Sequence, residues 1–96
     1  MTLYLADVGE DRRRRVLVVS GPRFGATTGR AVVVPEIGFD PDLPLSPWRV
    51  PFEETAALAV DRLTTVPKDV LHHQVGQLPI SETQQVRRLI VRGLTA

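Results

Sequence analysis

Four consecutive arginines, Arg12–Arg15, are the residues of this sequence that are most suited to a chemical role. They lead into residues 16–20, VLVVS, a run of β-branched and leucine residues that is typical of a strand buried on both faces. A guanidinium fixed at the start of such a strand can bind a phosphate through two parallel hydrogen bonds, and it stays protonated at every working pH. Because Arg15 adjoins the strand, we predict that it is held in place and acts as a phosphate clamp or transition-state stabiliser.

The three arginines before Arg15 have two interpretations. Arg12, Arg13 and Arg14 can supply diffuse attraction for a polyanion, or they can form an ordinary solvated turn. The charge is segregated along the chain, since the first 30 residues hold six arginines against three acids, whereas residues 31–61 hold one arginine against six acids. Such segregation permits a basic face on a protein whose net charge is only +1.

Other residues offer weaker chemistry. His72 and His73 are adjacent, so they point apart on a helix or strand and cannot chelate one metal ion. Residues 21–29, GPRFGATTG, lack the lysine–serine pair of a nucleotide-binding loop, and we expect them to form a turn. Trp48 and Phe52 can stack on a base, but such residues in a short edge strand more often fill a core or an interface. We therefore expect no metal and no cofactor.

The elements that must position these residues are mostly strands. We expect strands at 2–8, 16–20, 30–35, 48–52 and 57–66, the third stopped by Pro35 and the fourth at an edge because Pro51 cannot sit in a central strand. One helical turn is expected at 67–73. The clearest helix comes last, with Ser81 as N-cap and an apolar stripe of Val86, Leu89, Ile90 and Leu94. This order predicts a mainly β fold, a small, partly open antiparallel barrel with a C-terminal helix.

The bulk properties agree with one small domain. A chain of 96 residues fits a single domain, 1–96, with one core. The absence of cysteine excludes a disulfide framework and a cysteine-based zinc site. No secretory leader is visible, and no apolar run approaches the roughly 20 residues of a spanning helix. We therefore expect a soluble, cytoplasmic protein with no membrane partner.

Three segments together resemble a known superfamily. They are RVLVVS at 15–20, ATTGRAVVVP at 26–35 and VDRLTTVPKDVLHHQVGQLPISETQQVRRLIVRGL at 60–94. In this order they resemble the MazF/PemK/CcdB superfamily of toxin–antitoxin toxins. The resemblance implies an SH3-like barrel with a C-terminal helix, a homodimer, and neutralisation by a cognate antitoxin, which we expect to be small, acidic and partly disordered.

The resemblance implies two alternative activities. The MazF branch cleaves single-stranded RNA without metal, and its key arginine falls at Arg15. Its key threonine falls where this chain has Glu36-Ile37-Gly38, with no hydroxyl. Glu36 as base, or Ser20, Thr27 or Thr28 as a substitute hydroxyl, are the candidates to replace it. The residues expected to bind RNA are Arg12, Arg13, Arg14, Arg23, Thr27 and Thr28.

The CcdB branch poisons DNA gyrase through a terminal tryptophan-glycine-isoleucine. This chain carries Arg92 where that tryptophan belongs, and an arginine cannot fill the same apolar pocket without burying its charge. A third alternative is a catalytically degenerate module that still binds the antitoxin but performs no chemistry on RNA. Because Arg15 is present, we favour the metal-independent endoribonuclease, and we expect the antitoxin to bind across a groove between residues 9–15 and 21–29.

Overall fold

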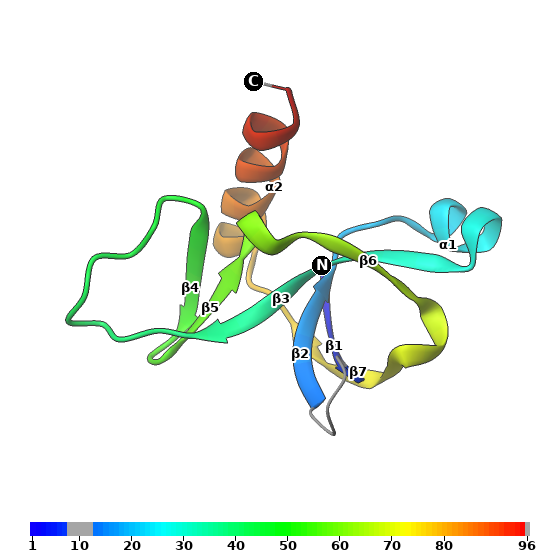
Figure 1. The fold of residues 1–96 in the computed structure, drawn as a ribbon, viewed down its shortest axis with the longest axis horizontal. Helices are drawn as coiled ribbons and strands as arrows, with labels where there is room; N and C mark the ends of the chain where they lie inside the picture. The colour runs from blue at the N-terminus through cyan, green and yellow to red at the C-terminus, as the bar shows by residue number, and fades with distance from the viewer. Residues whose placement is uncertain (8–12, 96) are drawn as a thin grey trace.

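The computed structural model describes residues 1–7 and 13–95, and the side chains among them up to residue 93. The elements run along the chain in the following order (Figure 1): β1 Thr2–Asp7, β2 Arg13–Val18, α1 Pro22–Thr28, β3 Arg30–Gly38, β4 Arg49–Glu53, β5 Ala56–Ala59, the 3₁₀ turn η1 Val60–Arg62, β6 Thr64–Pro67, the 3₁₀ turn η2 Lys68–Val70, β7 Leu71–Gln77 and α2 Ile80–Thr95.

The strands form one open sheet in the order β4-β5-β3-β2-β1-β7, and β6 pairs with β3 beside this path. Every pairing is antiparallel. The nine-residue strand β3 joins the two halves, since its first four residues pair with β6 and its last three with β5. The prediction of a mainly antiparallel, partly open sheet with a C-terminal helix is confirmed. None of the helices in the described residues is long and apolar enough to cross a membrane.

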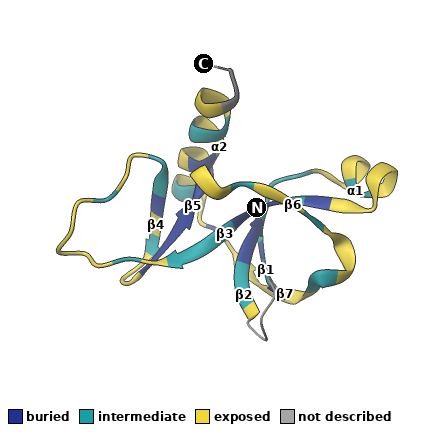
Figure 2. Cartoon of the chain, in the orientation of Figure 1, coloured by how far each residue is buried: buried dark blue, intermediate teal, exposed yellow. Residues whose placement is uncertain are grey.

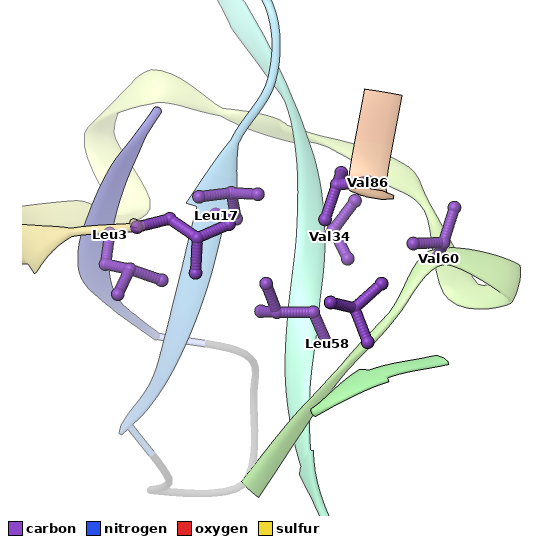
Figure 3. Close-up of a cluster of buried hydrophobic side chains, with 8 residues drawn as sticks. Leu3, Leu17, Val34, Leu58, Val60 and Val86 are labelled. Atoms are coloured by element: carbon purple, nitrogen blue, oxygen red, sulfur yellow. The ribbon is translucent and has the colours of Figure 1, made fainter. Parts of the chain in front are cut away.

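The core lies on both faces of the β2–β3 pair. On one face Leu17 and Val34 pack with Leu58 and Val86 (Figure 3), and on the other Val16 packs with residues of β1 and β3. Side chains alternate between the faces of a strand, so a continuous apolar run has a core to fill on each side. The dark blue of β5 and of the middle of β2 and β3 marks this burial in Figure 2.

Two expectations about proline and glycine segments were wrong. Residues 21–29 contain the helix α1, which Pro22 opens with a preset φ and which Gly29 ends in the left-handed conformation at φ 70°. Strand β3 also continues past Pro35 to Gly38. Its pairing with β6 ends at Val33 and its pairing with β5 begins at Glu36, so Pro35 lies in the gap between two partners, where a missing N–H disrupts neither ladder.

The segment from residue 57 to the start of α2 also differs from expectation. The long strand expected at 57–66 is divided by η1 into β5 and β6, which pair with different parts of β3. The turn expected at 67–73 is limited to Lys68–Val70, and both histidines lie in β7. Helix α2 begins at Ile80, so Ser81 lies inside its first turn and is not the N-cap that was expected, and its hydroxyl donates to the Glu82 carboxylate at 2.5 Å.

Candidate active site

Arg15 is held by three side chains from two other strands. Its Nη1 and Nη2 donate to the two carboxylate oxygens of Glu53 at 2.6 and 2.7 Å. Its Nη2 also forms an ion pair with Glu36, and its Cζ lies 4.9 Å from the centre of the Phe52 ring. The Arg15 side chain is 28% exposed, so it is fixed yet open to solvent. The structure thus places a rigid guanidinium where the sequence indicated one.

Strand periodicity explains why these groups meet. Arg15 lies on the face of β2 that also carries Leu17, and Glu36 lies on the face of β3 that carries Val34. The antiparallel register pairs Leu17 with Val34. Arg15, two residues before Leu17, and Glu36, two residues after Val34, therefore meet at the same end of the β2–β3 pair. Glu53 reaches the same place from β4, whose register with β5 is irregular just before it.

The electrostatics of this cluster favour the charged forms. Hydrogen bonding to Glu53 is the main cause that raises the pKa of Arg15, against the opposing effect of desolvation. The same hydrogen bond is the main cause that lowers the pKa of Glu53 below 4.5. Around neutral pH, a cationic Arg15 therefore faces an anionic Glu53.

Glu53 was missed by the sequence analysis. It stands 38 residues from Arg15 along the chain, and nothing local to Glu53-Glu54 distinguishes it from solvated surface charge. The only signal was its place at the end of a short strand interrupted by Pro51, a position where irregular pairing can redirect a side chain.

The other arginines of the cluster lie apart from this network. Arg12 lies outside the described residues. Arg13 is 57% exposed and approaches Asp7 at 3.5 Å. Arg14 lines a recess of about 420 Å³ with Arg49, Arg62, Ile37, Gly38 and Glu36. This recess borders the Arg15 network through Glu36, so three arginines from β2, β4 and η1 lie beside the candidate site.

The predicted hydroxyl substitutes lie at the opposite end of β2. The extended chain from Arg15 to Ser20 spans about 16 Å. The Ser20 hydroxyl accepts a hydrogen bond from the Val32 amide at 3.0 Å. Thr27 and Thr28 lie in α1 and donate to the carbonyls of residues 23 and 24 at 2.9 and 2.7 Å. None of these hydroxyls is brought to Arg15.

The expected antitoxin groove is corrected by the same geometry. Arg13–Arg15 open β2, whereas α1, with the exposed Arg23, follows its far end (Figure 1). Arg13–Arg15 and residues 21–29 therefore do not form the walls of one groove, and residues 9–12 of the expected groove lie outside the described residues. A recess of about 710 Å³ does lie beside α1, and Ser20, Pro22, Arg30, Lys68 and Arg87 are among its lining residues.

Trp48, Phe52 and His72 have structural contacts, and His73 is exposed. Trp48 packs against Gly93 of α2, where an added Cβ would lie 3.1 Å from the ring. The Phe52 ring lies under the Arg15 guanidinium and packs against the core. His72 Nε2 lies 2.7 Å from Asp7 Oδ2 across the β1–β7 pair. Among the described residues, no group of three or more His, Asp or Glu side chains is arranged to hold a metal ion.

Comparison with known proteins places this chain in a family of toxins. Residues 2–94 match the family described as PemK-like, MazF-like toxin of type II toxin-antitoxin system. A relative from Mycolicibacterium smegmatis, named probable endoribonuclease MazF, is 40% identical over 82 residues, which cover 77% of this chain and 71% of the relative.

Solved structures share the fold at lower sequence identity. A Mycobacterium tuberculosis toxin, MazF-mt6, has a TM-score of 0.77 at 18% identity, covering 98% of this chain and 96% of that one. A MazE–MazF complex from Deinococcus radiodurans has a TM-score of 0.81 at 17% identity, covering 98% and 91%. A mycobacterial endoribonuclease in complex with its cognate antitoxin has a TM-score of 0.80 at 20% identity, covering 97% and 90%.

Proposed function

This chain belongs to the PemK-like, MazF-like family of toxins of type II toxin–antitoxin systems, and we propose that it is an endoribonuclease that cleaves single-stranded RNA without metal. The observation that carries the proposal is Arg15, a fixed and solvent-accessible guanidinium beside two carboxylates at the start of β2. The 40% identity to a probable endoribonuclease supports it as well.

The reaction we propose is an intramolecular transfer at one phosphodiester. The ribose 2′-oxygen forms a bond to the adjacent phosphorus as the bond from phosphorus to the 5′-oxygen breaks. The products are a 2′,3′-cyclic phosphate and a 5′-hydroxyl end. One group must accept the proton of the 2′-hydroxyl, and the departing 5′-oxygen takes a proton from solvent water, which reaches the partly exposed site.

The residues have separate roles in this proposal. Negative charge grows on the phosphate in the transition state, and the Arg15 guanidinium stabilises it. The Glu36 carboxylate, already in contact with Arg15, takes the proton of the 2′-hydroxyl as general base. Glu36 replaces the threonine of the family pattern, because positions 36–38 carry no hydroxyl. Arg13 and Arg14 attract the RNA backbone.

The proposal extends to partners and location. We propose that the protein acts in the cytoplasm as a homodimer and that a small, acidic, partly disordered antitoxin neutralises it. Related toxins of this fold have been solved with their antitoxins, which supports a partner of this kind. An acidic segment that folds on binding suits the arginine-rich recess beside Glu36.

Incubation of the purified protein with total RNA in the presence of a chelator tests this function. We expect fragments with 5′-hydroxyl ends and 2′,3′-cyclic phosphates, and formation of these fragments that is slower by about 10²-fold or more with the Arg15→Ala variant. Cleavage that stops on chelation contradicts a metal-independent reaction. If the protein cleaves no RNA but stabilises gyrase–DNA complexes, the result indicates a gyrase poison. If it does neither, the result indicates a binding module.

A further inference from the structure

The hydrogen-bonding fork of Arg15 is already occupied in the free protein. Both terminal nitrogens donate to Glu53, one to each carboxylate oxygen. A carboxylate bound in this bidentate way has the same two-oxygen geometry as a phosphate on a guanidinium. An RNA phosphate can therefore take this arrangement on Arg15 only if Glu53 leaves it.

Glu53 is the carboxylate that can leave. Its side chain is 50% exposed, against 23% for Glu36. It ends β4, the edge strand, after an irregular pairing, whereas Glu36 lies in β3 between two neighbouring strands. Arg15 would also keep its place without Glu53, because Phe52 and Glu36 hold the guanidinium from other directions.

We propose that Glu53 occupies the phosphate subsite of Arg15 and that a phosphodiester of the bound RNA displaces it. This inference rests on the proposed function for the identity of the anion. The exchange replaces one negative charge by another, so the guanidinium stays neutralised throughout. Glu53 thus acts as a built-in competitor that sets the affinity for RNA, while Glu36 remains in place as the base.

The expected effect follows from the strength of such pairs. Removing an ion pair with a half-exposed partner changes an affinity by at most about fivefold. Because Glu53 competes with the ligand, its removal should tighten RNA binding by up to about fivefold. An ordinary structural ion pair would have the opposite effect or none.

The test measures binding of a 2′-deoxy oligonucleotide at fixed salt by fluorescence anisotropy. This probe keeps every phosphate but lacks the attacking hydroxyl, so binding is measured without cleavage. The variants are Glu53→Gln and, as a control for the same change in net charge, Glu54→Gln, whose exposed side chain follows directly in the sequence. We expect Glu53→Gln to bind several-fold more tightly than Glu54→Gln, and the difference to vanish in the Arg15→Ala background.

Four results would overturn the exchange. Equal affinities for the two glutamine variants, weaker binding by Glu53→Gln, or an effect that persists without Arg15 would each show that Glu53 is no competitor. Absence of oligonucleotide binding by every variant would do the same. A tighter Glu53→Gln combined with no RNA cleavage by the wild type would preserve the exchange and refute the endoribonuclease, so the two proposals fail separately.

Discussion

At the scale of single residues, Arg15 stands out because the fold has restricted its motion. A solvated arginine contributes counterion release, whereas a positioned one can act on one developing charge. Arg15 and Arg13 differ in this way, although they lie on the same face of the same strand. Arg15 meets Glu36, Glu53 and Phe52, whereas Arg13 is 57% exposed and approaches Asp7 at the end of β1.

The two arginines should therefore respond differently to truncation. We expect Arg15→Ala to lower single-turnover cleavage by about 10²-fold or more with little loss of RNA affinity. Arg13→Ala should leave the rate at saturating RNA intact and reduce the salt slope of binding by at most about 0.7. Equal and small effects at both positions would mean a solvated turn and would remove the case for a catalytic Arg15.

The Arg15–Glu53 pair also predicts a pH dependence of stability. The pKa of Glu53 is lower in the folded protein than its ordinary 4.5, chiefly through the hydrogen bond from Arg15. A lowered folded-state pKa contributes stability that is fully present above pH 4.5 and lost as the pH falls through the folded value. Denaturant unfolding should therefore show a difference between wild type and Glu53→Gln that shrinks below pH 4.5. A difference independent of pH would contradict this linkage.

At the scale of elements, α2 closes the core at one end of the sheet. Val86 is fully buried, Leu89 and Ile90 pack against the same cluster, and Arg87, Arg88 and Arg92 are exposed. The predicted stripe is thus confirmed for its described members; the Leu94 side chain lies outside the described residues. Figure 3 shows Val86 directed at Val34 and the interior.

The helix makes a prediction about stability. Val86→Ala should lower the free energy of unfolding by about 2 kcal/mol, because it deletes two methyl groups from a fully packed site. Arg88→Ala, on the exposed face, should change it by less than about 0.5 kcal/mol. Equal losses in denaturant unfolding would show that α2 does not pack on the sheet by this face.

The end of α1 makes a second prediction at this scale. Gly29 has φ 70°, whereas Gly21 at the start of α1 has φ −80°, and an added Cβ meets nothing within 4 Å at either position. Gly29→Ala should therefore cost about 1 kcal/mol through backbone strain alone. Gly21→Ala should cost nothing or stabilise slightly, by restricting the unfolded chain. Thermal unfolding of both variants separates conformational strain from packing.

At the scale of the whole molecule, a 96-residue chain has a limited core. Large apolar side chains remain on the surface, with Leu43 64% exposed and Ile80 77% exposed. Burial of such surface against a second copy would add stability that the single chain lacks. This is the physical reason for expecting a homodimer.

Sedimentation across a concentration series tests the assembly. We expect a dimer at micromolar concentration, and a stability that rises with protein concentration because dissociation is coupled to unfolding. A monomer at all concentrations, with an unfolding midpoint independent of concentration, would contradict the prediction.

The sequence by itself determined that strands lie at β1 to β4, that a helix ends the fold and that Arg15 is the residue to examine, whereas β7 was not expected. Apolar runs and a helical stripe are local patterns, so their period predicts which face is buried wherever the element lies. The same local reasoning failed where a partner mattered: Pro35 is tolerated because β3 changes neighbours there, and residues 57–66 are broken because β5 and β6 pair with separate parts of β3.

Only the tertiary structure decided which residues surround Arg15. Glu36 and Glu53 reach it because the β2–β3 register and the order of β3, β5 and β4 carry residues 15, 36 and 53 to one end of the sheet. Ser20, only five positions away in sequence, is carried to the other end because an extended strand separates them. Proximity along the chain and proximity in space differ here because strand pairing, a long-range interaction, sets the neighbours of each side chain.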